Sequence, residues 1–192
     1  MSLASILRKV ALVLTSLFAV GGIAFALGYA FEDLSGWAPW LLTAAVVVPL
    51  VGLTAMAVRS PRRALHVLVA AIGLFAVWAV LTLFVDIDAP TVPVIAVVLA
   101  LPIAVVGQRY ATQAGELLIA VAAVPLLLLV VRLLTEWGAE GPGLQGALGT
   151  STGAVVVPLL VLAMLFLAGG VAGRHGPAGH APVEPKTPAT RT

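Results

Sequence analysis

Residues 62–88 read RRALHVLVAAIGLFAVWAVLTLFVDID, and this stretch decides the class of fold. Two arginines precede an uninterrupted apolar run from Ala64 to Val85, and Asp86 and Asp88 end it. A run of about 20 apolar residues is long enough to cross the roughly 30 Å hydrocarbon core of a bilayer as an α-helix. The stretch therefore predicts a transmembrane helix with bases at its start and acids at its end.

Similar apolar runs lie on both sides of this one. The predicted spans are Val10–Ala30, Trp37–Val58, Ala64–Val85, Val92–Gly107, Leu117–Leu134 and Leu148–Val171. The fourth is the weakest prediction, because about 16 apolar residues are marginal for a full crossing. We expect an all-α integral membrane bundle of six transmembrane helices in one domain, residues 1–172. Residues 173–192 are rich in Gly, Pro, Ala and Thr and predict a disordered cytoplasmic tail.

The composition supports a membrane protein and limits its partners. Of the 192 residues, 61% are hydrophobic and only 9% are charged, against roughly 25% charged in soluble domains. With a mean hydropathy of +1.16, the chain has too little polar surface to coat a soluble globule, so the lipid bilayer is its first expected partner. The net charge is only +2 and the bases are dispersed at span ends, so no nucleic acid is expected.

The distribution of bases predicts the orientation, because Lys and Arg concentrate in cytoplasmic loops. If the N-terminus is inside, only Arg132 falls on the outer side. The inner bases are then Arg8, Lys9, Arg59, Arg62, Arg63, Arg109, Arg174, Lys186 and Arg191. Most acids lie on the opposite side. We therefore predict a multi-pass protein of the cell inner (plasma) membrane with both termini cytoplasmic (N-in/C-in), which requires an even number of spans and so counts Val92–Gly107 as a crossing.

The first span has a second interpretation, as a secretory signal. Ala24-Phe25-Ala26 resembles a small-residue cleavage site after Arg8, Lys9 and an apolar run. The run is longer than the 7–15 residues of a typical signal core, which favours a retained helix. Cleavage would leave five spans and an unchanged remaining topology.

A weak repeat is visible in the spacing of the spans. The starts at Val10, Ala64 and Leu117 recur at intervals of 54 and 53 residues, which suggests three helical hairpins. One proline lies in the second helix of each hairpin: Pro49, Pro102 and Pro158. Repeats of this kind are common in transporters, but short loops between six spans also produce such a period. Both readings stay open.

Ionisable residues inside the hydrocarbon usually mark functional sites, and none lies near the middle of a predicted span. Arg132, near the outer end of the fifth span, is interpreted as a snorkelling base or a partner of Glu136. The alternative is an anion-attracting residue at an outer vestibule. Glu116 opens the predicted fifth helix, where it would complement the helix dipole. His66 is interpreted as interfacial, with pH sensing as the alternative.

No motif for catalysis or metal binding is present. His175 and His180 stand five apart in the predicted tail without a preorganised partner, and Asp86 and Asp88 alone are too short a match for a metal–nucleotide site. There is no cysteine, and loops of roughly 5 to 14 residues leave no room for an extramembrane catalytic domain. We predict no catalytic, cofactor-binding or metal-binding residues, no cofactor and no enzymatic activity.

Small residues inside the spans provide surfaces for close helix contact. Gly22, Ala26 and Ala30 share one face of the first span, and Gly169 and Gly173 form a GxxxG motif in the sixth. They serve internal packing, or contact with a membrane protein partner or a second copy of the chain. The predicted function is a non-catalytic accessory or scaffold subunit acting through helix contacts. The alternative is a small transporter or channel with proline-kinked helices, for which the spans offer few polar residues: Thr15, Ser16, Thr43, Thr54 and Thr82.

Overall fold

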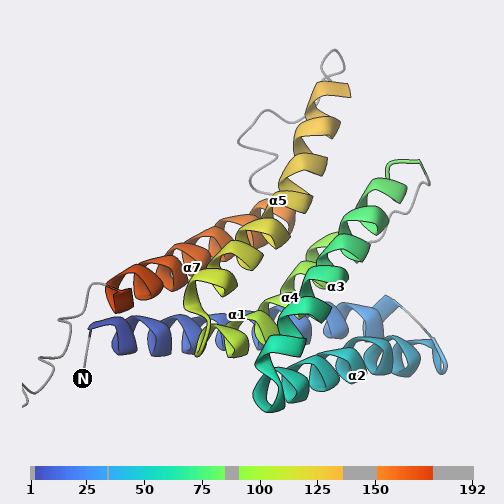
Figure 1. The fold of residues 1–192 in the computed structure, drawn as a ribbon. Helices are drawn as coiled ribbons and strands as arrows, with labels where there is room; N and C mark the ends of the chain where they lie inside the picture. The colour runs from blue at the N-terminus through green and yellow to red at the C-terminus, as the bar shows by residue number, and fades with distance from the viewer. Residues whose placement is uncertain (1–2, 34, 85–90, 136–150, 175–192) are drawn as a thin grey trace, which may run out of the picture.

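The computed structural model describes residues 3–33, 35–84, 91–135 and 151–174. Within these ranges every regular element is an α-helix, which confirms the all-α prediction (Figure 1). The helices are α1 (Leu3–Asp33), α2 (Ala38–Arg59), α3 (Pro61–Leu81), α4 (Thr91–Gly107), α5 (Ala111–Thr135) and α7 (Ser151–Arg174). All but α4 are long and apolar enough to cross a membrane, and α4 is a shorter apolar helix. The predicted tail beyond residue 174 lies outside the described residues.

Several helix ends differ from the predicted span ends. Helix α1 begins at Leu3 instead of Val10, and α5 begins at Ala111 instead of Leu117. The helices extend beyond the predicted spans because hydropathy identifies only the part of a helix that lies in hydrocarbon, whereas backbone hydrogen bonding continues through polar residues outside it. Helix α3 ends at Leu81, before the predicted span end at Val85, and residues 82–84 form a turn.

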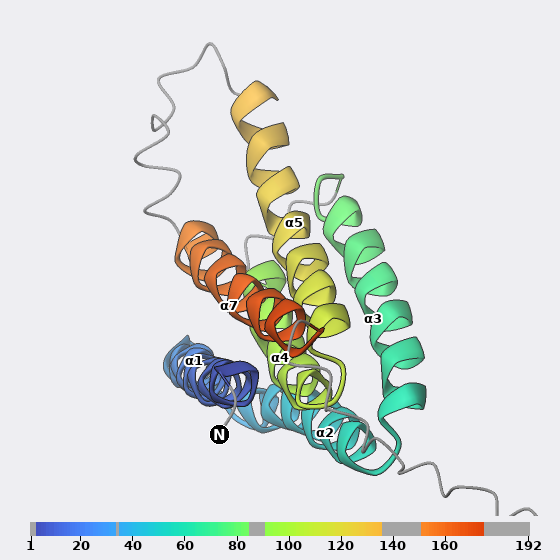
Figure 2. The same cartoon turned by 60° about the vertical axis from the view of Figure 1, so that its left-hand side comes forward.

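Helix α4 is the centre of the bundle, although its sequence was the weakest span prediction. It packs against α1, α2, α3, α5 and α7, and it lies in the middle of the bundle in the view of Figure 2. Its 17 residues correspond to roughly 25 Å of helix. Because protein surrounds α4, its length need not match the thickness of the bilayer. An apolar sequence on all sides is typical of such a buried helix.

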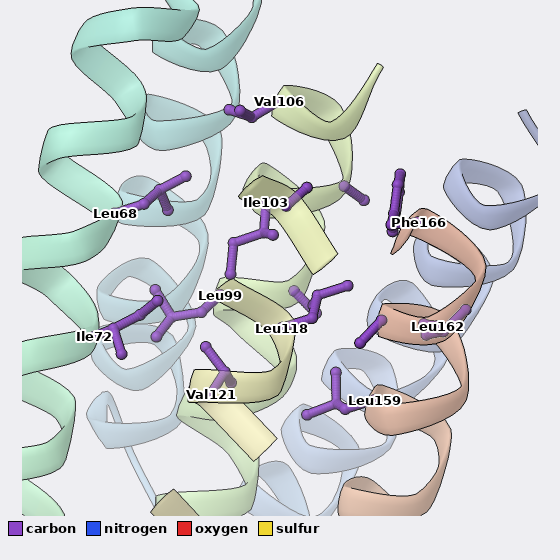
Figure 3. Packing of buried hydrophobic residues seen from close by; sticks show 14 of the residues in the cluster. Leu68, Ile72, Leu99, Ile103, Val106, Leu118, Val121, Leu159, Leu162 and Phe166 are labelled. Atoms are coloured by element: carbon purple, nitrogen blue, oxygen red, sulfur yellow. The ribbon is translucent and has the colours of Figure 1, made fainter. Parts of the chain in front are cut away.

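An alanine stripe lets neighbouring helices approach α4 closely. Ala96, Ala100 and Ala104 are fully buried and follow one another at a spacing of four residues, which places them on one helix face. Larger side chains from α3, α4, α5 and α7 pack around the same centre (Figure 3). They include Leu68, Ile72, Leu99, Ile103, Val106, Leu118, Val121, Leu159, Leu162 and Phe166. Since lipid tails are equally apolar, this core is held by van der Waals packing.

Gly22 of α1 and Gly169 of α7 lie at contacts between helices inside the bundle. A Cβ atom built at Gly22 of α1 would lie 2.9 Å from Cγ1 of Val97 in α4. A Cβ atom at Gly169 of α7 would lie 3.2 Å from Cγ of Arg8 in α1. These glycines therefore permit contacts between helices of the same chain. This supports the internal-packing interpretation of both motifs.

The packing does not reflect three equivalent hairpins. Helix α5 packs closely against α7, but α1 packs chiefly against α7 and α4 and much less against α2. The recurring prolines also differ in surroundings, because Pro102 is fully buried, Pro158 is half-buried and Pro49 is exposed. The repeat hypothesis thus has no counterpart in the arrangement of the helices.

Candidate functional site

The interior of the described bundle holds few polar groups. Its buried polar side chains are Thr15 and Thr82. Their hydroxyls donate to nearby backbone carbonyl oxygens, Thr15 to Ala11 within α1 and Thr82, directly after α3, to Ala79, both at 2.7 Å. The Oγ1 atom of Thr54 is also buried and has no hydrogen-bond partner among the described residues. These hydroxyls do not form a continuous polar route.

The ionisable residues considered from the sequence do not converge on one site. Glu116 is exposed in the second turn of α5 and does not open that helix, so the prediction of its position was wrong. Since the unpaired N–H groups belong to the first turn, its interaction with the helix dipole is weaker than expected. His66 is exposed, and its Nδ1 donates to the carbonyl oxygen of Arg62 at 2.8 Å.

Other predicted residues fall outside the described part of the structure. Arg132 lies on α5, but its side chain is not described. The residues Asp86, Asp88, Glu136, His175 and His180 also lie outside the described ranges. Within those ranges, no group of His, Cys, Asp and Glu is arranged to hold a metal ion.

The basic residues gather at one end of the bundle, where the start of α1 lies beside the end of α7 (Figure 1). Nε2 of Gln108, in the turn between α4 and α5, donates to the carbonyl oxygen of Arg8 at 3.0 Å. Nε of Arg62, at the start of α3, donates to Oη of Tyr110 at 3.4 Å. These bonds join the start of α1 and the α2–α3 turn to the α4–α5 turn. We call this the basic end.

The opposite end carries acidic and aromatic residues. The ring of Phe31, near the end of α1, meets the ring of Trp40, near the start of α2, edge to face with centroids 5.2 Å apart. Glu32 is exposed beside Phe31. Tryptophan rings such as that of Trp40 prefer the level of the lipid headgroups. Most bases and acids of the described helices therefore lie at opposite ends of the bundle, with Glu116 and Arg132 of α5 as the exceptions.

A shallow, largely open pocket lies at the basic end, between the α2–α3 turn and the α4–α5 turn. This basic pocket has a volume of about 460 Å³ and is lined by Ser60, Pro61, Arg62, Arg63, Arg109 and Tyr110. Its arginines are exposed and its tyrosine is half-buried. In the part of the chain that the structure describes, none of the three arginines pairs with a carboxylate. Among the described residues, the positive charge of the pocket is therefore not paired with a carboxylate.

The least covered surface of the bundle is on α2. Only 6% of the residues in its most apolar segment are buried, against 22–33% in the other long helices. Leu41, Val48 and Val51 are 55%, 68% and 59% exposed, and a Cβ atom built at Gly52 would have no neighbour within 4 Å. We call these four residues the open face of α2. The face combines branched apolar side chains with a glycine that a neighbouring helix could approach.

Comparison of the chain with models of protein families, with curated proteins and with solved structures finds no match.

Proposed function

We propose that this multi-pass membrane protein is a non-enzymatic accessory or scaffold subunit that acts through helix contacts with a membrane protein partner. The open face of α2 is the observation that carries the proposal. Gly52 of α2 has no neighbour within 4 Å, as is also true of glycines on α1 and α3. What sets α2 apart is that only 6% of its most apolar segment is buried, against 22–33% in the other long helices. In a bilayer, a free small residue among branched side chains favours a partner helix, because close packing gains van der Waals contacts that mobile lipid tails supply less well.

The alternative function, a small transporter or channel, has weaker support. It requires a polar cavity that water can enter, and the described interior offers only threonine hydroxyls, most of them bonded to nearby backbone carbonyl oxygens. The prolines favoured this alternative, but Pro102 and Pro125 are fully buried in the packed core. There they shape helices that contact one another, which suits a scaffold.

We further propose that the protein lies in the cell inner (plasma) membrane with its basic end and both termini in the cytoplasm. The chain contains no cysteine, so a single introduced cysteine can be labelled without background. We expect a membrane-impermeant thiol reagent to label Ser35→Cys in intact cells and to leave Ser60→Cys unlabelled until the membrane is opened. Labelling of Ser60→Cys in intact cells would contradict the orientation.

The contact function predicts a stable complex at native expression levels. Purification in a mild detergent should give a species heavier than the 19.6 kDa chain, containing a second membrane protein in fixed stoichiometry. Val48→Trp, which adds bulk to the open face of α2, should reduce recovery of that partner about tenfold, equivalent to about 1.4 kcal/mol of binding free energy. Leu74→Trp is the matched control because Leu74 is similarly exposed, on α3, and recovery should then be unchanged.

One result would identify the partner, and another would refute the proposal. A complex that contains only copies of this chain would identify the partner as a second copy. A single, monodisperse chain without any partner would refute the accessory function.

A further inference from the structure

The basic pocket contains the groups that bind phosphate oxygens. Three guanidinium groups line it, and each can donate two parallel hydrogen bonds to a phosphate. Ser60 adds a hydroxyl that makes no capping hydrogen bond with α3. The start of α3 lies in the same wall, where unpaired backbone N–H groups and the positive end of the helix dipole also favour an anion. Charge, donors and an accessible hollow therefore coincide.

One of the guanidinium groups is oriented by a hydrogen bond to a neighbouring side chain. Arg62 uses its Nε atom to donate to Oη of Tyr110, and its two Nη groups make no hydrogen bond within the described residues. The bond is long, at 3.4 Å, and exposed, so Tyr110 is a positioning residue that orients Arg62 without fixing it. A donor that is already oriented loses less conformational entropy when it binds a ligand.

The surroundings of the pocket favour a lipid as the source of the phosphate. The pocket opens at the ends of helices that are apolar along the rest of their length. Val67, one turn after Arg63 on the same face of α3, is 42% exposed, and Val58 in the last turn of α2 is 60% exposed. A charged pocket next to exposed apolar side chains matches a molecule with a phosphate group and acyl chains. Free phosphate has no apolar part that could pack against the valines.

We propose that the basic pocket binds the phosphodiester headgroup of an anionic phospholipid, with the acyl chains along Val58 and Val67. Basic pockets between transmembrane helices on the cytoplasmic side are a known mode of anionic lipid recognition. This site is separate from the open face of α2, so it stands or falls independently of the proposed partner contact.

The test compares lipids that differ only in the headgroup. Native mass spectrometry of the purified protein in a neutral detergent should show phosphatidylglycerol binding about tenfold more tightly than phosphatidylcholine with the same acyl chains. The double variant Arg62→Gln/Arg109→Gln should lose this preference. Tyr110→Phe should lower the affinity for phosphatidylglycerol and leave that for phosphatidylcholine unchanged. Equal binding of the two lipids to the unaltered protein would overturn the proposal without any variant.

A matched double variant separates the pocket from general surface charge. Lys9→Gln/Arg59→Gln removes the same charge from exposed residues that do not line the pocket. It should keep most of the preference for phosphatidylglycerol, whereas a diffuse electrostatic attraction would fall equally in both double variants and contradict a defined site. Thermal unfolding of each variant checks that the bundle is intact.

Competition with inorganic phosphate distinguishes the two sources of the anion. We expect millimolar phosphate to leave bound phosphatidylglycerol in place, because phosphate lacks the contacts with the valines. Displacement at equal affinity would assign the pocket to free phosphate and overturn the lipid as its ligand. The recovery of a protein partner through α2 is unaffected by either result.

Discussion

Replacing Gly107 by valine is expected to destabilise the bundle by about 3 kcal/mol, at the upper end of overpacking in a filled core. Gly107 ends α4, where α5 and α7 come close. A Cβ atom built there would lie 2.5 Å from Cε1 of Phe166 and 3.0 Å from Cβ of Ala114. The valine therefore forces these helices apart. Titration with sodium dodecyl sulfate, followed by tryptophan fluorescence, measures the change in unfolding free energy.

The control is the same substitution at an open glycine. A Cβ atom built at Gly73 of α3 would have no neighbour within 4 Å. Gly73→Val should change the unfolding free energy by no more than about 0.5 kcal/mol, as is usual for surface substitutions. If both valines had the same effect, the close approach of α4, α5 and α7 at Gly107 would be wrong.

Replacing Phe166 by alanine is expected to lower the free energy of unfolding by about 3 kcal/mol. Phe166 of α7 is fully buried, and it belongs to the central cluster of Figure 3. Its removal leaves a void that lipid tails cannot reach, so the surrounding side chains lose van der Waals contacts that nothing replaces. The same detergent titration measures the loss.

An exposed phenylalanine and a double variant test this explanation. Phe84 is 81% exposed, so lipid can fill the space after Phe84→Ala, and stability should change by no more than about 0.5 kcal/mol. Since Phe166 is the side chain that a valine at position 107 would strike, Gly107→Val/Phe166→Ala should lose less stability than the sum of the single variants. Simple additivity would show that the two residues do not contact each other as described.

The helices could be predicted from the sequence because hydropathy is a local property. Each apolar run of about 20 residues predicts a helix without reference to the rest of the chain, as the run from Ala64 to Val85 does. The place of a helix in the bundle depends on which partners it packs against, and the composition of one helix does not contain that information. The alanine stripe at Ala96, Ala100 and Ala104 was readable in the sequence, but only the packing shows that α4 is surrounded by other helices.

The candidate sites could be predicted only in part, for the same reason. The gathering of most bases at one end and most acids at the other follows from their positions between apolar runs. The basic pocket does not, because Arg62 and Tyr110 are 48 residues apart in the chain and meet only when α3 and α5 pack together. The GxxxG motif at Gly169 was recognised as a contact surface, but its partner, α1, lies within the same chain.

Site-specific photo-crosslinking in the native membrane tests most directly whether α2 is the contact surface of this protein. A photoreactive amino acid placed at Val48, on the open face of α2, should give one discrete protein adduct at native expression levels. At Leu74, an equally exposed position on α3, the same group should react only with lipid. Lipid adducts alone at both positions would contradict the proposed function.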